Sequence, residues 1–143
     1  MKKHNISFRL VSYTDAAGKY NPEAFRSGNE DNFYVDDDLT DETTNRVAQD
    51  EVLQLGSLGM LMVVADGMGG MNAGEVASQI AIDTVKSAFK AESLTDSVIA
   101  TSQTRQKYLE QVIKQADRNI KSEARKDNSR EGMGSTIIMA WLF

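Results

Sequence analysis

The chain has 143 residues, 41% of them apolar, with 16 Lys and Arg against 21 Asp and Glu and no cysteine. This length suits one compact domain or part of a larger one, and the composition argues against disorder. A formal net charge of −5 without a long basic tract disfavours nucleic-acid binding. The N-terminus lacks a signal-peptide pattern, and the uncharged apolar stretch 132–143 is shorter than the ~20 residues of a membrane helix. Because a chain without cysteine also fits a reducing compartment, we expect a cytoplasmic protein that binds neither nucleic acid nor membrane.

The first half of the chain predicts three strands. Residues 6–13 alternate between apolar and polar with period two, which is typical of a half-buried strand. A loop over 19–27 leads to the β-forming run 32–35, and the acidic segment 39–59 predicts a solvated connection. The continuous apolar run 60–65 then predicts a strand buried on both faces at the centre of a sheet.

The second half predicts two helices and a last strand. Apolar residues recur at helical spacing over 73–91, and a second such pattern begins near Thr95-Asp96 and ends at Asp127-Asn128. The run 132–143 is typical of a buried strand. The order strand-strand-strand-helix-helix-strand favours an α+β domain with largely antiparallel pairing.

Asp66-Gly67-Met68-Gly69-Gly70 lies between the predicted central strand and a helix. Three interpretations are open: a tight turn without a ligand, a phosphate site on helix N-terminal amides, or a divalent cation on carboxylate and carbonyl oxygens. Asp66 favours the cation, because a carboxylate repels phosphate unless a bound metal reverses the local charge. The glycine spacing matches neither the dinucleotide fingerprint nor the Walker loop.

A second group of polar residues, Arg26-Ser27-Gly28-Asn29-Glu30-Asp31, precedes the second strand. Neighbouring side chains on an extended chain point to opposite sides, so Glu30 and Asp31 cannot both face one ion. One could bind the metal while the other orients a metal-bound water. Arg26 has the planar guanidinium that suits phosphate recognition, although an arginine in a loop is more often only a surface residue.

Three motifs together resemble a known family. Arg26-x-x-Asn29-Glu30-Asp31, the segment 63–78 and Gly132-Met133-Gly134-Ser135-Thr136 are similar, in order and spacing, to the N-terminal half of bacterial metal-dependent protein serine/threonine phosphatases of type 2C, the PPM family. The resemblance implies that residues 1–143 are the N-terminal portion of a four-layer α-β-β-α sandwich with mainly antiparallel sheets and flanking helices.

The resemblance also implies a reaction and a site. Two divalent cations, Mn²⁺ or Mg²⁺, would activate a water that hydrolyses phosphoserine or phosphothreonine in a phosphorylated protein substrate. Asp66 would bridge the cations, Gly67 would bind one through its carbonyl oxygen, and Glu30 would bind the same ion. Asp31 would lie next to the metal ligands without binding a cation directly, and Arg26 would bind the phosphate.

Two departures from the family matter. Some members have a histidine after the Asp-Gly pair, proposed as the acid for the leaving group, where this chain has Met68. Two further aspartates, expected from a C-terminal half of roughly a hundred residues by the same resemblance, are missing, so the second metal position is incomplete. The alternative to an enzyme is therefore an inactive fragment or pseudophosphatase that acts as a binding module. The apolar segment 137–143 also predicts self-association, because a strand edge without neighbours is a template for pairing with another chain.

Overall fold

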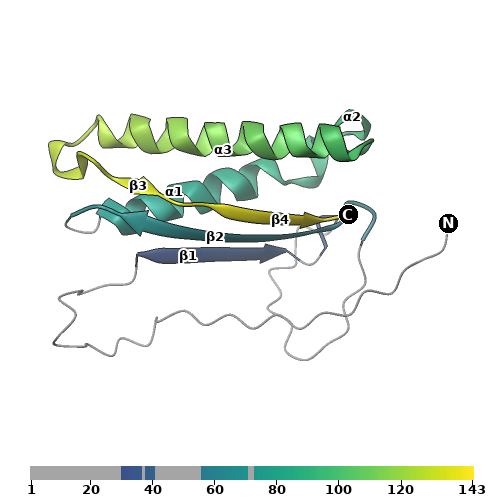
Figure 1. Cartoon of the computed structure of the whole chain (residues 1–143), viewed down its shortest axis with the longest axis horizontal. Coiled ribbons are helices and arrows are strands. Elements are labelled where there is room, and N and C mark those ends of the chain that lie inside the picture. Colours follow the sequence, from purple (N-terminus) through teal and green to yellow (C-terminus); the bar gives the residue numbers. More distant parts are fainter. Residues whose placement is uncertain (1–29, 37, 41–55, 71–72) are drawn as a thin grey trace, which may run out of the picture.

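The computed structural model describes residues 30–36, 38–40, 56–70 and 73–143. They form one antiparallel four-stranded sheet with helices on one of its faces (Figure 1). In chain order the elements are β1 (Asp31–Asp36), β2 (Met60–Met68), α1 (Ala73–Ala88), α2 (Asp96–Ile99), α3 (Ser102–Ala124), β3 (Gly134–Ser135) and β4 (Ile138–Leu142), with short 3₁₀ turns at Ala91–Ser93 and Asn128–Arg130. This arrangement confirms the predicted α+β class. The predicted strand 6–13, the loop 19–27 and most of the connection 39–59 lie outside the described residues.

Strand β2 is the centre of the sheet, as its apolar sequence predicts. It pairs with β1 on one side, and with β3 and β4 on the other. Leu61, Val63 and Ala65 are at most 1% exposed and lie on the side of the helices. The expectation of burial on both faces is wrong for the described structure, because Val64 on the opposite face is 54% exposed. The described helices cover only one face, so β2 alternates between buried and exposed residues.

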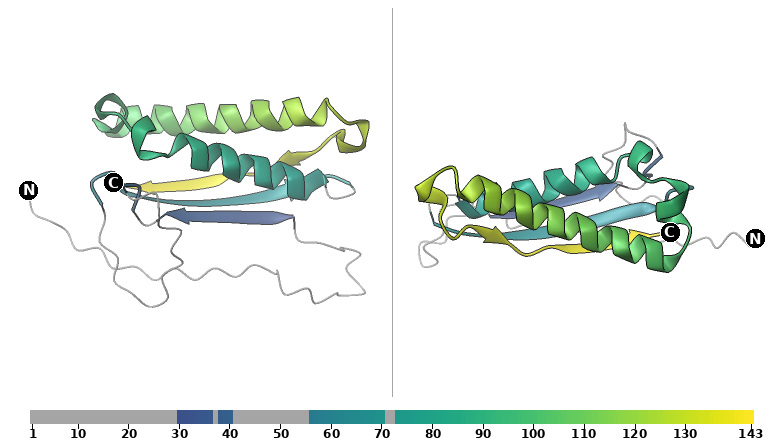
Figure 2. Two further views of the ribbon diagram at one scale, coloured as in Figure 1. Left: turned by 180° about the vertical axis from the view of Figure 1, so that it is seen from behind. Right: turned by 90° about the horizontal axis from the view of Figure 1, so that it is seen from above.

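Small residues bring α1 close to the sheet. Ala73, Ala77 and Ala81 recur every four residues and are at most 2% exposed, which places them on one face of the helix. Helix α3 crosses above α1 and buries Val112 and Ala116 toward the same core (Figure 2). The helical layer therefore packs on the sheet through α1, which fixes the first turn of α1 beside the end of β2.

Two predicted elements are interrupted in the structure. The helical pattern that begins at Thr95-Asp96 is divided into α2 and α3, because Thr101 starts a new helix with a capping box. In it the Thr101 hydroxyl accepts from the Thr104 amide, and the Thr104 hydroxyl accepts from the Thr101 amide. The predicted strand 132–143 is likewise divided, into β3 and β4, at Thr136 and Ile137. It is also less buried than expected, since Ile138 is 73% exposed.

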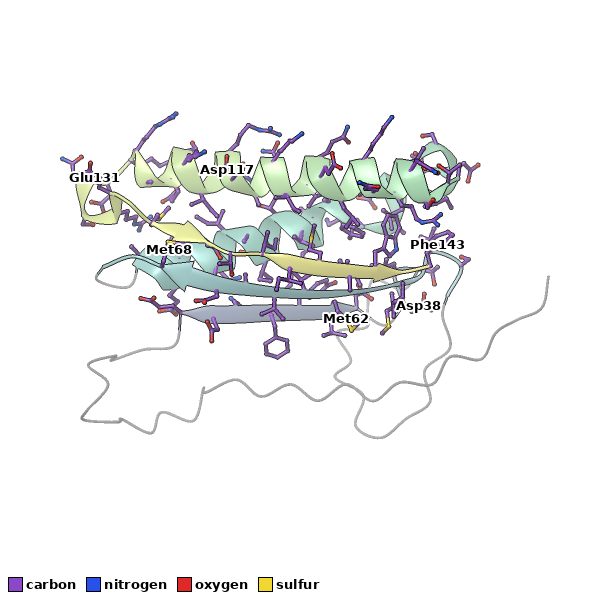
Figure 3. All side chains as sticks on the ribbon, viewed as in Figure 1. Asp38, Met62, Met68, Asp117, Glu131 and Phe143 are labelled. Carbon is purple, nitrogen blue, oxygen red and sulfur yellow. The ribbon has the colours of Figure 1, made fainter. Side chains whose placement is uncertain are left out.

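An aromatic cluster closes one end of the sheet. The rings of Phe89 and Trp141 meet edge to face with centroids 5.0 Å apart, and the Trp141 indole donates to the Leu58 carbonyl at 3.0 Å. Phe143 lies at this end, whereas Met68 lies at the other (Figure 3). None of the helices in the described part of the chain is both long and apolar enough to span a membrane. Of the polar residues singled out by the sequence, the described carboxylates Glu30, Asp31 and Asp66 lie toward the Met68 end.

Candidate functional site

Asp66 and Gly67 lie inside β2, near its end. The sequence predicted that the strand ends before Asp66, but the structure continues it to Met68. The extension follows from strand pairing, because the neighbours of these residues on both sides come from distant parts of the chain. A strand fixes the backbone better than a free loop does, so the two residues occupy defined positions on the sheet.

Asp66 lies directly opposite Asp31 of β1. The next residue pair, Glu30 and Gly67, is joined by a hydrogen bond from the Gly67 amide to the Glu30 carbonyl at 3.1 Å. Because hydrogen-bonded and non-hydrogen-bonded pairs alternate in an antiparallel ladder, Asp31 and Asp66 form a non-hydrogen-bonded pair, in which side chains approach most closely. Both side chains are exposed, and both project from the sheet face opposite the helices. This pair therefore places two carboxylates side by side.

Glu30 and Gly67 are packed against the first turn of α1. A Cβ atom at Gly67 would lie 2.0 Å from the Gly74 carbonyl oxygen, and one at Gly74 would lie 2.7 Å from the Cδ of Glu30. These distances leave no room for a side chain at either glycine. The Glu30 carboxylate consequently lies on the helix side of the sheet, beside the start of α1, whereas its neighbour Asp31 lies on the opposite side.

The backbone of Asp66 is held from the β3 side. The Thr136 amide donates to the Asp66 carbonyl at 2.8 Å, and the Ser135 hydroxyl donates to the same oxygen at 3.1 Å. The Asp66 amide donates to the Thr136 hydroxyl at 3.2 Å. The predicted site did not include Gly74, Ser135 or Thr136, although the sequence motifs 63–78 and 132–136 contain them. A glycine in a helical first turn and two hydroxyls opposite an aspartate are the signals that could have identified them.

The loop after β2 begins with two glycines. Gly69 has a φ of +154°, which favours glycine, and the Gly70 carbonyl accepts from the Ala73 amide at 3.0 Å. Met68 is 55% exposed at the end of the strand, and its thioether lies beside Gly134 (Figure 3). Methionine offers neither a proton donor nor a charged group, so Met68 contributes shape to this end of the sheet.

The described residues suit a hard divalent cation by their chemistry. Carboxylate and backbone carbonyl oxygens are the ligands that Mg²⁺ and Mn²⁺ prefer, and Glu30, Asp66 and Gly67 supply them from two adjacent residue pairs of the β1–β2 ladder. Within the described part of the chain, no group of three or more His, Cys, Asp or Glu residues is placed to hold a metal. The fit is therefore one of donor chemistry, because in this structure the Glu30 carboxylate lies beside α1 and the Asp66 carboxylate lies on the opposite face of the sheet, next to Asp31. Arg26 lies outside the described residues.

Comparison with known proteins identifies the family of the chain. The family described as Protein phosphatase 2C matches residues 40–143, which include Asp66 and Gly67 but not Glu30. The serine/threonine phosphatase stp of Listeria innocua is 31% identical over 80 residues, covering 56% of this chain and 30% of that protein.

Solved structures show the same fold. A crystal structure of a bacterial serine phosphatase variant superposes with a TM-score of 0.64 at 28% identity, covering 92% of this chain and 47% of the other. The Mycobacterium tuberculosis serine/threonine phosphatase PstP/Ppp gives a TM-score of 0.53 at 28% identity, covering 82% of this chain and 37% of the other. The chain thus spans less than half the length of these relatives. Because the family match extends over most of its residues, the chain belongs to the protein phosphatase 2C family.

Proposed function

We propose that the protein to which this chain contributes hydrolyses phosphoserine or phosphothreonine in proteins with the help of two divalent cations, Mn²⁺ or Mg²⁺. The observation that carries this proposal is the placement of Asp66 and Gly67 on the central strand, directly beside Asp31 and Glu30, in a member of the protein phosphatase 2C family. The names of the relatives support the same reaction class.

In this proposal each residue has a distinct task. Asp66 and Glu30 bind cations through their carboxylates, and Gly67 does so through its carbonyl oxygen. When bound, the cations supply an activated water for attack on phosphorus and neutralise the charge on the phosphoryl oxygens. Asp31, which neighbours Asp66 on the sheet, accepts a hydrogen bond from the attacking water and so orients it. Arg26 binds the phosphate through its guanidinium.

The proton for the leaving oxygen comes from water in this scheme. Met68 occupies the position that directly follows Gly67, and its side chain cannot donate a proton. The described residues also contain no histidine, because the single His4 lies outside them. The ligands that complete the second cation position come from a part of the whole protein that this chain does not include.

The proposal is tested by phosphate release from a phosphothreonine peptide in the presence of Mn²⁺. We expect turnover by the whole protein that is lost on chelation and in Asp66→Asn, and little or no turnover by the 143-residue chain alone. A whole protein that binds Mn²⁺ and the phosphopeptide without turnover would favour the alternative, a binding module. A whole protein that binds no divalent cation would contradict the proposal.

We also propose that the chain associates with itself through β4. Among the described strands β4 pairs only with β2, and Ile138 and Phe143 are 73% and 50% exposed. An apolar strand with one free edge adds readily to another strand of the same kind. The expected product is a dimer in which β4 of each copy pairs with its counterpart.

A further inference from the structure

The strand opposite Asp66 is interrupted without a change of register. Gly67 pairs with Ser135 in β3, and Val64 pairs with Ile138 in β4, so Asp66 falls opposite Thr136 in the same alignment. The interruption is therefore not a β-bulge, since a bulge adds a residue and shifts the pairing. Its cause lies in the hydrogen bonds that Thr136 and Asp66 exchange.

One of these two hydrogen bonds is a normal ladder bond and the other is not. Residues in a hydrogen-bonded antiparallel pair each donate an amide to the other's carbonyl. The Thr136 amide does so, to the Asp66 carbonyl at 2.8 Å, but the Asp66 amide donates to the Thr136 side-chain hydroxyl at 3.2 Å. The Thr136 carbonyl lies 2.8 Å from the Ser135 hydroxyl, whose single hydrogen is shared between this carbonyl and the Asp66 carbonyl at 3.1 Å. Two side-chain hydroxyls thus replace one backbone bond at the Asp66 position.

The Asp66 carboxylate has no other support in the described structure. It is exposed, and within the described part of the chain its oxygens accept no hydrogen bond and form no ion pair. Its position therefore depends on its backbone, whose amide and carbonyl are both held by Thr136 and, at the carbonyl, by Ser135. A change in these bonds would turn the peptide units on either side of Asp66, including the Gly67 carbonyl.

We infer that Thr136, assisted by Ser135, is a positioning residue that aims the Asp66 carboxylate and the Gly67 carbonyl at a bound cation. The inference rests on the proposed function and deepens it, because it names the residues that orient the shared ligand. Groups that hydrogen-bond to the ligands of a metal typically change its affinity by ~10–100-fold when they are removed. The hydroxyl of Thr136 is the group expected to have this effect.

The experiment compares Mn²⁺ affinity, measured by calorimetry and by the electron paramagnetic resonance signal of bound Mn²⁺, across matched variants. Thr136→Val keeps the branched shape and removes the hydroxyl, whereas Thr136→Ser keeps the hydroxyl. We expect Mn²⁺ to bind about 10-fold more weakly to Thr136→Val and to bind Thr136→Ser nearly as the wild type does. Thr95→Val is the control for loss of a hydroxyl, because Thr95 is exposed and, among the described residues, its hydroxyl contacts only Ser97.

Thermal unfolding separates positioning from a structural role. If Thr136→Val does not fold, Ser135→Ala removes the smaller contribution, and we expect it to weaken Mn²⁺ binding less than Thr136→Val would. Equal Mn²⁺ affinity for the wild type and a folded Thr136→Val would overturn the inference, as would a Thr136→Ser variant as weak as Thr136→Val. Absence of Mn²⁺ binding by the wild type would contradict the proposed function itself, and the inference with it.

Discussion

Replacing Gly74 by alanine should displace the Glu30 carboxylate without replacing any of the proposed ligands. The new Cβ would lie 2.7 Å from the Cδ of Glu30, 2.8 Å from its Oε2 and 3.0 Å from the carbonyl carbon of Gly67. An ordinary contact begins at 3.4 Å, so the carboxylate must retreat by about 0.7 Å. The Glu30 side chain can rotate away, but the Gly67 backbone is fixed in β2 and cannot.

The expected change in stability follows from two opposing effects. Alanine in place of a helical glycine gains ~1 kcal/mol, and overpacking costs ~1–3 kcal/mol. The variant should therefore lose up to ~2 kcal/mol of its free energy of unfolding, and each kcal/mol corresponds to a fall in Tm of ~2–4 °C in a chain of this size. Because the displaced group is a metal ligand in the proposed site, Mn²⁺ affinity should fall by ~10-fold or more.

Calorimetric titration with Mn²⁺ and a thermal melt of the same samples measure both effects. Gly70→Ala is the matched control, because a Cβ at Gly70 meets nothing within 4 Å, and it should bind Mn²⁺ as the wild type does. A Gly74→Ala variant with wild-type Mn²⁺ affinity and wild-type Tm would refute the argument, because it would show that the first turn of α1 does not limit the position of Glu30.

Three further predictions concern the substrate, the association state and pH. In the whole protein, Arg26→Ala should raise the KM for a phosphopeptide more than it lowers Mn²⁺ affinity, since a phosphate-binding residue acts on the substrate; equal losses would assign Arg26 a structural role. Ile138→Lys should convert a self-associated chain into a monomer in sedimentation experiments, because a charge on an exposed strand opposes pairing; an unchanged sedimentation coefficient would contradict association through β4. Burial, aided by the hydrogen bond to Asp36, raises the pKa of Tyr34 above its ordinary value of 10.0. The contribution of Tyr34 to stability is therefore complete below pH 10 and is lost as the pH rises further. Above pH 10 the Tyr34→Phe variant should lose less of its free energy of unfolding than the wild type does. Identical pH profiles of stability for the two proteins would contradict the assignment of this loss to Tyr34.

The elements with strong patterns could be predicted from the sequence. The apolar run at 60–65 identified the central strand, the β-forming residues at 32–35 identified β1, and the helical spacing after Ala73 identified α1. Each of these signals is local, because burial on one face imposes a period of two or 3.6 on the residues themselves. The three motifs likewise predicted the family correctly.

The details that depend on distant partners could not be predicted. Asp66 and Gly67 belong to β2 because β1 and β3 extend beside them, and no local pattern marks this. The division of the last strand at Thr136 comes from its side-chain bond to Asp66, 70 residues away in the sequence. The tight contact of Gly74 with Gly67 and Glu30 appears only when α1 is packed on the sheet. The roles of Arg26 and the cytoplasmic location stay predictions.

The most direct test of the metal site is a calorimetric titration of the chain with Mn²⁺, comparing the wild type with Asp66→Asn. Asparagine keeps the shape of the side chain and removes its charge, and Asp66 is exposed, so the change in stability should stay within about ±0.5 kcal/mol. Asp117→Asn is the control, because Asp117 lies on the outer side of α3, where it pairs with Lys121 (Figure 3). We predict that the wild type and Asp117→Asn bind Mn²⁺ and that binding by Asp66→Asn largely disappears; an unchanged Mn²⁺ affinity in Asp66→Asn would contradict the assignment of this end of the sheet as a metal site.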